Sequence, residues 1–175
     1  MSFSSKIKEE LAEHFATARH CNLAELSAIV RLSGIFADKK NGGCALRVHT
    51  ENFGVARKCF TLLRKPFNIR NDIVVRRNMA TGNCSYFLYA KGEELLAVRN
   101  AMTQSVCCKR AYIRGAFLAA GSVSDPSKSY HFEIVCDKEE QAEHLKDMIN
   151  SFGMDAKIVK RKKMYVVYLK EGSQI

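Results

Sequence analysis

The chain has 175 residues, and its 28 Lys and Arg residues outnumber its 18 Asp and Glu residues to give a formal net charge of +10. Hydrophobic residues make up 47% of the chain and charged residues 26%, which is typical of a globular domain and excludes a disordered or fibrous chain. No stretch approaches the ~20 apolar residues that a membrane-spanning helix needs. The length predicts one domain, large enough to bury a core without metal or disulfide support.

Hydrophobic periodicity predicts an order of helix, strand pair, helix, strand pair and helix over the first part of the chain. A helix is expected over 5–15, and a second begins after Asn22, whose side chain would cap it, with Glu25 in the capping-box position. The other expected elements are strands at 35–38 and 44–50 around an Asn-Gly turn, a helix at 52–64, strands at 69–77 and 84–91, and a helix at 93–102.

The same order then begins again. The second set of expected elements is a helix at 108–120, strands at 122–124 and 130–136, a helix at 138–151, and strands at 156–161 and 165–170. Two copies of a unit of roughly 80–90 residues are too long and too few for a solenoid. The sequence therefore predicts one α+β domain over 1–175, with two pseudo-symmetric αββαββ(α) repeats at about 22–102 and 107–175 and with the final helix truncated.

The two repeats align best at the helices 26–34 and 113–121, which are apolar and end in glycine. Small residues along one side of each helix allow two helix backbones to approach closely. We therefore expect these helices to pack on each other. The residues expected at this repeat interface are Ala28, Gly34, Gly115, Ala119 and Gly121.

Positive charge is concentrated in two segments, at 57–77 and 157–170. The first carries seven basic residues and one acidic residue, and the second carries six basic residues and none that are acidic. Basic faces on two sheets predict a saddle for duplex DNA, with most contacts made to phosphates, although a solvated surface explains the charges equally well. The expected DNA contacts are Arg47, His49, Arg70, Arg76, Arg77, Lys157, Lys160, Arg161, Lys162 and Lys163.

The seven cysteines form no Cys-x-x-Cys pair, and the five histidines show no ligand spacing with them. The sequence therefore predicts free thiols in a reducing cytoplasm, no metal site and no cofactor. Cys107 and Cys108 open a helix, which lowers a thiol pKa. No sequence signal pairs a histidine with them, so we expect a packing role rather than catalysis.

The segment 112–123, YIRGAFLAAGSV, resembles the second signature helix of the LAGLIDADG homing endonucleases, and 25–34 resembles the first. The resemblance implies that family's fold over nearly the whole chain. Homing endonucleases cut DNA with metal ions held by an acidic residue just before the closing glycine of each signature helix. Those positions are Ser33 and Ala120 here, and neither side chain can bind a divalent cation as a carboxylate does.

Residues 1–11, 24–26 and 108–123 more specifically resemble the WhiA family of bacterial regulators, whose amino-terminal LAGLIDADG domain is degenerate. The homing-endonuclease signature has another acidic position before the metal-binding one. Arg31 and Leu118 occupy that position here, so this acidic residue is also lost in both helices. The resemblance implies a non-enzymatic, nucleoid-associated transcription regulator of sporulation and cell division. Its implied partners are double-stranded DNA and other regulatory proteins, without a membrane or a small-molecule substrate. The helix-turn-helix domain that follows in that family is absent from this chain.

Two alternatives to a non-catalytic DNA-binding domain stay open. A nuclease with a shifted metal site would use Asp38 and Asp125, which each lie four residues past a closing glycine, but Asp is also favoured at turns. The domain could instead be an interaction or ligand-sensing scaffold, with DNA bound by the missing helix-turn-helix domain. The two basic segments favour DNA binding over such a scaffold.

Overall fold

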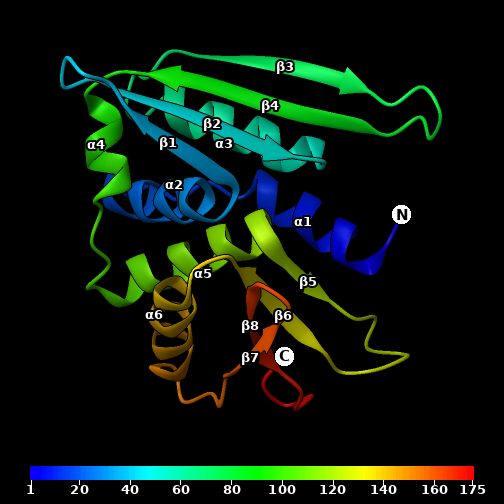
Figure 1. Ribbon diagram of the computed structural model, residues 1–175. Coiled ribbons are helices and arrows are strands. Elements are labelled where there is room, and N and C mark those ends of the chain that lie inside the picture. The colour runs from blue at the N-terminus through cyan, green and yellow to red at the C-terminus, as the bar shows by residue number, and fades with distance from the viewer. The chain divides into compact units, whose positions relative to one another are not determined.

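The computed structural model describes residues 1–175 as two compact units, one formed by 8–119 and the other by 1–7 together with 120–175. Each unit is built on a four-stranded antiparallel sheet with helices beside it (Figure 1). The expected α+β class is therefore confirmed. None of the helices is both long and apolar enough to cross a bilayer.

The larger unit contains the first sheet, with strand order β1-β2-β4-β3. Its strands are β1 (Gly34–Asp38), β2 (Cys44–Thr50), β3 (Asn71–Arg77) and β4 (Cys84–Lys91). Its helices are α2 (Arg19–Ser33), α3 (Phe53–Arg64), α4 (Glu94–Arg99) and nearly all of α5 (Val106–Ala120). Helix α1 (Phe3–Glu13) begins in the smaller unit and continues into the larger one.

The smaller unit contains the second sheet, with the equivalent strand order β5-β6-β8-β7. Its strands are β5 (Gly121–Val123), β6 (Phe132–Cys136), β7 (Lys157–Arg161) and β8 (Met164–Leu169), and its helix is α6 (Glu139–Asn150). The start of the chain joins this unit through Ser4, whose hydroxyl donates to the Val123 carbonyl and accepts from the Val123 amide, both at 2.8 Å.

One face of the first sheet carries the core of the larger unit. Alternate residues of β2 are buried, so Leu46 and Val48 pack inward while Arg47 and His49 are exposed, as a half-buried strand requires. Helices α2 and α3 cover the inward face with side chains such as Ile29 and Leu62 that are fully buried. The other face of the sheet is therefore left open.

The beginning of α2 differs from the prediction. The helix starts at Arg19 rather than after Asn22, and its cap residue is Ala18, which makes no side-chain capping bond. Asn22 is buried in the first turns of the helix, and its side-chain amide donates to the Ala16 carbonyl at 3.0 Å. The expected capping box is therefore wrong, because Asn22 fixes the chain before the helix and the Glu25 side chain is used elsewhere.

Helices α2 and α5 meet where Gly115 lies against the α2 backbone. A Cβ atom at Gly115 would overlap the Glu25 carbonyl oxygen and lie 3.0 Å from the Ala28 Cβ. Gly34 serves a different approach, because a Cβ there would overlap the Val30 carbonyl and reach Leu46 Cδ1 at 2.9 Å. Ala119 is half-buried near the end of α5, and Gly121 is buried at the start of β5.

Glu25 lies at the centre of a buried ion-pair cluster in the larger unit. Its carboxylate accepts two parallel hydrogen bonds from the Arg114 guanidinium, at 3.0 and 3.1 Å, and pairs with Lys58. The Lys58 ammonium also donates to the carbonyls of Leu11, at 2.9 Å, and His14, at 2.6 Å. Burial lowers the pKa of Lys58, while Glu25 acts to raise it. The cluster joins α1, α2, α3 and α5.

Candidate nucleic-acid interface

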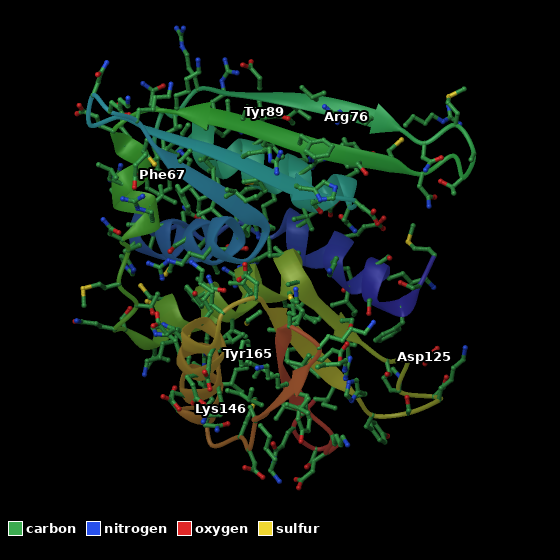
Figure 2. All side chains as sticks on the ribbon, in the orientation of Figure 1. Phe67, Arg76, Tyr89, Asp125, Lys146 and Tyr165 are labelled. Carbon is green, nitrogen blue, oxygen red and sulfur yellow. The ribbon has the colours of Figure 1, made fainter.

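The outer face of the first sheet is the candidate interface. We use this name for the alternate side chains that point away from the core, together with Arg70, which precedes β3 in the same alternation. The cross-strand register places Arg47 opposite Tyr89, and His49 and Val74 on either side of Phe87. Figure 2 shows Arg76 and Tyr89 on this sheet. The polar and aromatic members of the face are Arg47, His49, Arg70, Asp72, Arg76, Phe87, Tyr89 and Lys91.

The Phe87 ring contacts both a histidine and an arginine on this face. The His49 and Phe87 rings are stacked, with centroids 4.6 Å apart and planes at 19°. The Arg76 guanidinium lies 5.0 Å from the centroid of the same Phe87 ring. A cation over an aromatic face is held by the ring quadrupole, and a partly immobilised side chain loses less entropy when it binds a phosphate.

Charge on the outer face of the first sheet is predominantly positive. Arg47, Arg70, Arg76 and Lys91 are exposed, and Asp72 is the acidic side chain among them. A surface of this kind attracts polyanions, and arginine side chains suit phosphate groups because of their fork of N–H donors.

The structure separates Arg77 from the other expected contacts of the first sheet. Arg76 and Arg77 are neighbours in β3, so their side chains lie on opposite faces. Arg77 shares its face with Ile73 and Val75, and all three are exposed. The grouping of Arg76 and Arg77 into one contact surface is therefore corrected.

The expected contacts of the second sheet are more dispersed. Lys157 and Arg161 share the face of Glu133, whereas Lys160 lies on the opposite face, with its ammonium 5.6 Å from the Tyr165 ring centroid. Lys162 and Lys163 are exposed in the turn between β7 and β8.

Acidic groups offset the basic residues of the second sheet. Glu133 lies 2.9 Å from His131 Nε2 and 3.5 Å from Arg161 Nη2, and Asp155 lies 3.7 Å from the Lys157 ammonium. Acidic side chains therefore offset much of the charge of Lys157 and Arg161, while Lys162 and Lys163 add positive charge at the turn.

The positions that the resemblance assigns to metal ligands have local structural partners. The Ser33 hydroxyl donates to the Ile29 carbonyl of its own helix, and Ala120 ends α5 without a polar side chain. Arg31, at the preceding acidic position, donates to the carbonyls of Arg99 and Ala101. Ser33 and Arg31 therefore bond to backbone carbonyls, Ala120 offers only a methyl group, and none of the three is an anionic ligand.

The two aspartates of the shifted-metal alternative are also engaged locally. Asp38 forms an ion pair with Arg99 at 2.8 Å. Asp125 accepts from the Ser127 amide at 2.9 Å and from the Ser127 hydroxyl at 2.7 Å, and these bonds lower the pKa of Asp125. Both carboxylates act as turn or surface groups, as their positions in the sequence allow.

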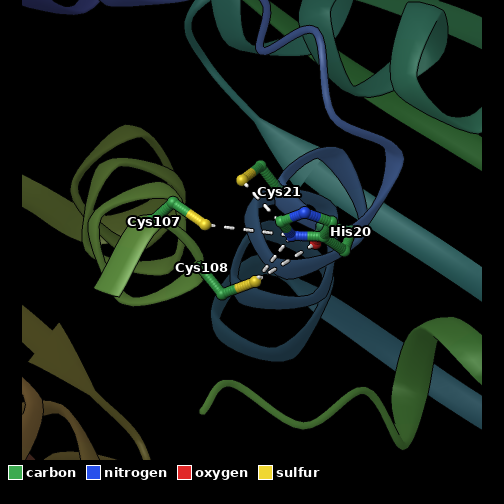
Figure 3. A group of neighbouring side chains, drawn as sticks. All are labelled: His20, Cys21, Cys107 and Cys108. Atoms are coloured by element: carbon green, nitrogen blue, oxygen red, sulfur yellow. Dashed lines mark hydrogen bonds between the residues drawn. The ribbon is translucent and has the colours of Figure 1, made fainter. Parts of the chain in front are cut away.

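The cysteines and histidines depart from the expectation of no ligand grouping. All seven cysteines are free thiols. However, the ligand atoms of His20, Cys21, Cys107 and Cys108 all lie within 4.8 Å of one another (Figure 3). The sequence does not reveal this cluster, because its two halves lie far apart in the chain and follow no metal-binding motif. Phe87, Tyr89 and Lys91 were also missed, although strand alternation from Arg47 and His49 would have identified them.

Two family descriptions match this chain. Residues 19–97 match the WhiA N-terminal LAGLIDADG-like domain, and residues 109–175 match the WhiA LAGLIDADG-like domain. A protein named "Probable cell division protein WhiA" from Lachnoclostridium phytofermentans is 46% identical over 100% of this chain and 63% of its own length. The protein of the same name from Alkaliphilus metalliredigens is 41% identical over 100% of this chain and 62% of its own length. The chain thus spans about three fifths of these relatives.

Solved structures show the same fold. Full-length DUF199/WhiA from Thermatoga maritima superposes with a TM-score of 0.83 at 21% identity, covering 99% of this chain and 59% of that one. I-DmoI, a homing endonuclease solved in complex with DNA and Mn, superposes with a TM-score of 0.61 at 14% identity. That superposition covers 86% of this chain and 89% of I-DmoI.

Proposed function

The chain belongs to the WhiA family, and from this premise we propose that it binds duplex DNA without cleaving it, through the outer face of the first sheet. In this proposal the domain serves a nucleoid-associated bacterial regulator of transcription in sporulation and cell division. A helix-turn-helix domain of the whole protein would supply further DNA contacts.

The observation that carries the proposal is the composition of that face. Four exposed basic side chains surround an aromatic strip formed by His49, Phe87 and Tyr89, with one acidic side chain among them. Phosphate contacts of this kind position a protein on duplex DNA without reading its sequence. We therefore expect binding with low sequence preference and a steep dependence on salt.

The absence of cleavage rests on Ser33 and Ala120. A metal-dependent nuclease needs oxygen ligands that hold divalent cations beside the scissile phosphate. A hydroxyl bonded to its own helix and a methyl group supply no such charge.

A scaffold that binds another regulatory protein is the second candidate, and the exposed apolar strip of β3 favours it. Ile73, Val74 and Val75 are 38, 41 and 55% exposed. Consecutive exposed apolar residues on an edge strand are typical of a protein-binding surface.

The proposal is tested by measuring the affinity for a short fluorescent DNA duplex by anisotropy over a range of salt concentrations. The variant Arg47→Glu/Arg76→Glu removes two proposed phosphate contacts, so the slope of log affinity against log salt should fall by about 2. Arg57→Glu/Lys65→Glu is the matched control, because it changes the net charge by the same amount. Both residues are exposed, one within α3 and one at its carboxyl end, and α3 lies on the other side of the sheet from the proposed interface.

Retained affinity in the outer-face variant, or an equal loss in the control, would reject the proposed interface. If affinity for DNA is negligible in the unmodified chain at low salt, the scaffold gains support. Cleavage of supercoiled plasmid in Mg²⁺ that is abolished by Asp125→Ala would contradict the non-catalytic part of the proposal.

A further inference from the structure

Two dipeptides of the larger unit bring four metal-ligating side chains together. His20 and Cys21 lie in the first turn of α2, and Cys107 and Cys108 lie in the first turn of α5. Figure 3 shows the four side chains pointing into the space between these two helix ends. The positions are 86 residues apart between Cys21 and Cys107, so the arrangement depends on the tertiary fold.

The distances from the imidazole nitrogen to the three sulfur atoms bracket the edge length of a zinc tetrahedron, and all four ligand atoms lie within 4.8 Å of one another. His20 Nδ1 lies 3.1 Å from Cys108 Sγ, 3.5 Å from Cys21 Sγ and 3.9 Å from Cys107 Sγ. Around one tetrahedral Zn²⁺ ion, nitrogen–sulfur edges are about 3.6 Å and sulfur–sulfur edges about 3.8 Å. Small side-chain rotations would therefore convert the observed cluster into a complete coordination shell.

We propose that His20, Cys21, Cys107 and Cys108 form a structural Zn²⁺ site that joins the beginnings of α2 and α5. Three thiolates and one imidazole are a ligand set of structural zinc sites, and soft sulfur ligands disfavour Mg²⁺ and Ca²⁺. All four positions are supplied by protein side chains, which leaves no open position for a substrate.

The surroundings support the charged form of the ligands. The amino termini of α2 and α5 meet at the cluster, and the dipoles of both helices favour thiolates there. The Ser105 hydroxyl lies 3.3 Å from Cys107 Sγ, close enough to donate a hydrogen bond to a thiolate there. Zinc binds cysteine as the thiolate, so each cysteine ligand would lose its proton when the ion binds.

The site has a mechanical consequence for the larger unit. Helices α2 and α5 are already in close approach at Gly115 and Ala28. A metal bridge at the beginnings of the same helices would fix their relative rotation at a second point. His20 and Cys107 are exposed, so the ion would stay accessible to a chelator.

The site is tested by measuring the zinc content of the 175-residue chain purified under reducing conditions without added metal. We expect about one zinc per chain, and substitution by Co²⁺ should give the intense visible bands of a tetrahedral thiolate site. Cys107→Ser should weaken zinc binding roughly 100-fold or more, and Ser105→Ala roughly 10-fold through loss of the outer hydrogen bond. Cys107 is exposed, so its replacement should leave the fold intact.

Cys84→Ser is the matched control, because Cys84 is a half-buried free thiol outside the cluster. This variant should leave the zinc content and the cobalt spectrum unchanged. A chain without zinc that also gives no tetrahedral cobalt spectrum would overturn the proposal. A disulfide between Cys21 and Cys107 or Cys108 in the reduced preparation, or an equal loss of zinc in Cys84→Ser, would overturn it as well.

Discussion

The two sheets share one strand order but differ in the charge of their outer faces. The first residue of the first strand in each sheet, Gly34 or Gly121, pairs with Val48 or Ile134 of the next strand. Arg47 and Glu133 each lie one residue before that partner, so they occupy equivalent positions in the two sheets. These equivalent positions carry opposite charges. Arg47 adds to a basic surface, whereas Glu133 pairs with His131 and Arg161. Strand order determines where a side chain lies, but each repeat has acquired its own surface chemistry.

The largest expected effect is on stability and distinguishes Glu25 from Glu133, each of which contacts two basic side chains. Glu25→Gln should lower the free energy of unfolding by about 3–5 kcal/mol, because it leaves Lys58 buried with an incomplete partner set. Glu133→Gln should cost at most about 1 kcal/mol, because its pairs are partly exposed. Urea denaturation followed by circular dichroism measures both values, and similar losses in the two variants would contradict the distinction.

The next largest expected effect is a loss of DNA affinity, and it should differ between the outer faces of the two sheets. Arg47→Glu/Arg76→Glu should lower duplex affinity roughly 100-fold at low salt, because each change removes one phosphate contact and adds a repulsive charge. Lys157→Glu/Arg161→Glu makes the same change on the second sheet and should lower affinity much less, since acids already offset these residues. Anisotropy titrations of both variants decide the point. A larger loss in the second-sheet variant would reverse the assignment.

A pH dependence should be shared by the two units. Burial raises the pKa of Cys59 in the larger unit and of Cys136 in the smaller unit to about 12, from an ordinary value of 9.0. The folded state therefore keeps protons that the unfolded state releases, so this stability is complete below pH 9 and is lost as the pH rises toward 12. Each thiol contributes a slope of at most about 1.4 kcal/mol per pH unit.

Unfolding free energies of the unmodified chain and of Cys59→Ala and Cys136→Ala, measured between pH 8 and 11, test this expectation. The loss of stability with pH should be shallower in each variant. Lys58, whose pKa burial lowers, contributes to all three proteins and cancels in the difference. Parallel curves would show that these thiols do not contribute.

The smallest expected effect is a gain of affinity for DNA. Glu133→Gln removes the acid beside Arg161, so duplex affinity should rise by about 2-fold to 3-fold at low salt and by less at high salt. The measurement uses the same anisotropy titration, with Glu143→Gln on α6 as a charge-matched control. A decrease in affinity would show that Glu133 positions Arg161 for binding rather than competing for it.

Local patterns in the sequence were sufficient for the order of helices and strands. Alternation predicted the exposed positions of Arg47 and His49, and the Asn-Gly turn predicted the β1–β2 pair. Several element ends differ from the prediction: α1 spans Phe3–Glu13 rather than 5–15, α4 ends at Arg99 rather than at 102, and β6 begins at Phe132 rather than at 130. Helix ends depend on capping and on tertiary neighbours, which periodicity does not report.

The sites that the sequence did not reveal depend on contacts between distant segments. Glu25 has the position of a capping-box residue, yet its partners Lys58 and Arg114 come from α3 and α5. His20 and Cys108 meet only because α2 and α5 meet, and no spacing rule connects them. Arg77 and Lys160 differ from these cases, because alternation along a strand was enough to place them opposite Arg76 and Arg161.

Arg31 determines how the linker between α4 and α5 is held. Its guanidinium anchors the carbonyls of Arg99 and Ala101, in the linker between α4 and α5. An acidic side chain introduced at position 31 would remove these donors and place a negative charge beside the two carbonyls. Arg31 therefore couples the end of α2 to the linker mechanically, and a change at this one position would loosen the connection that leads into α5.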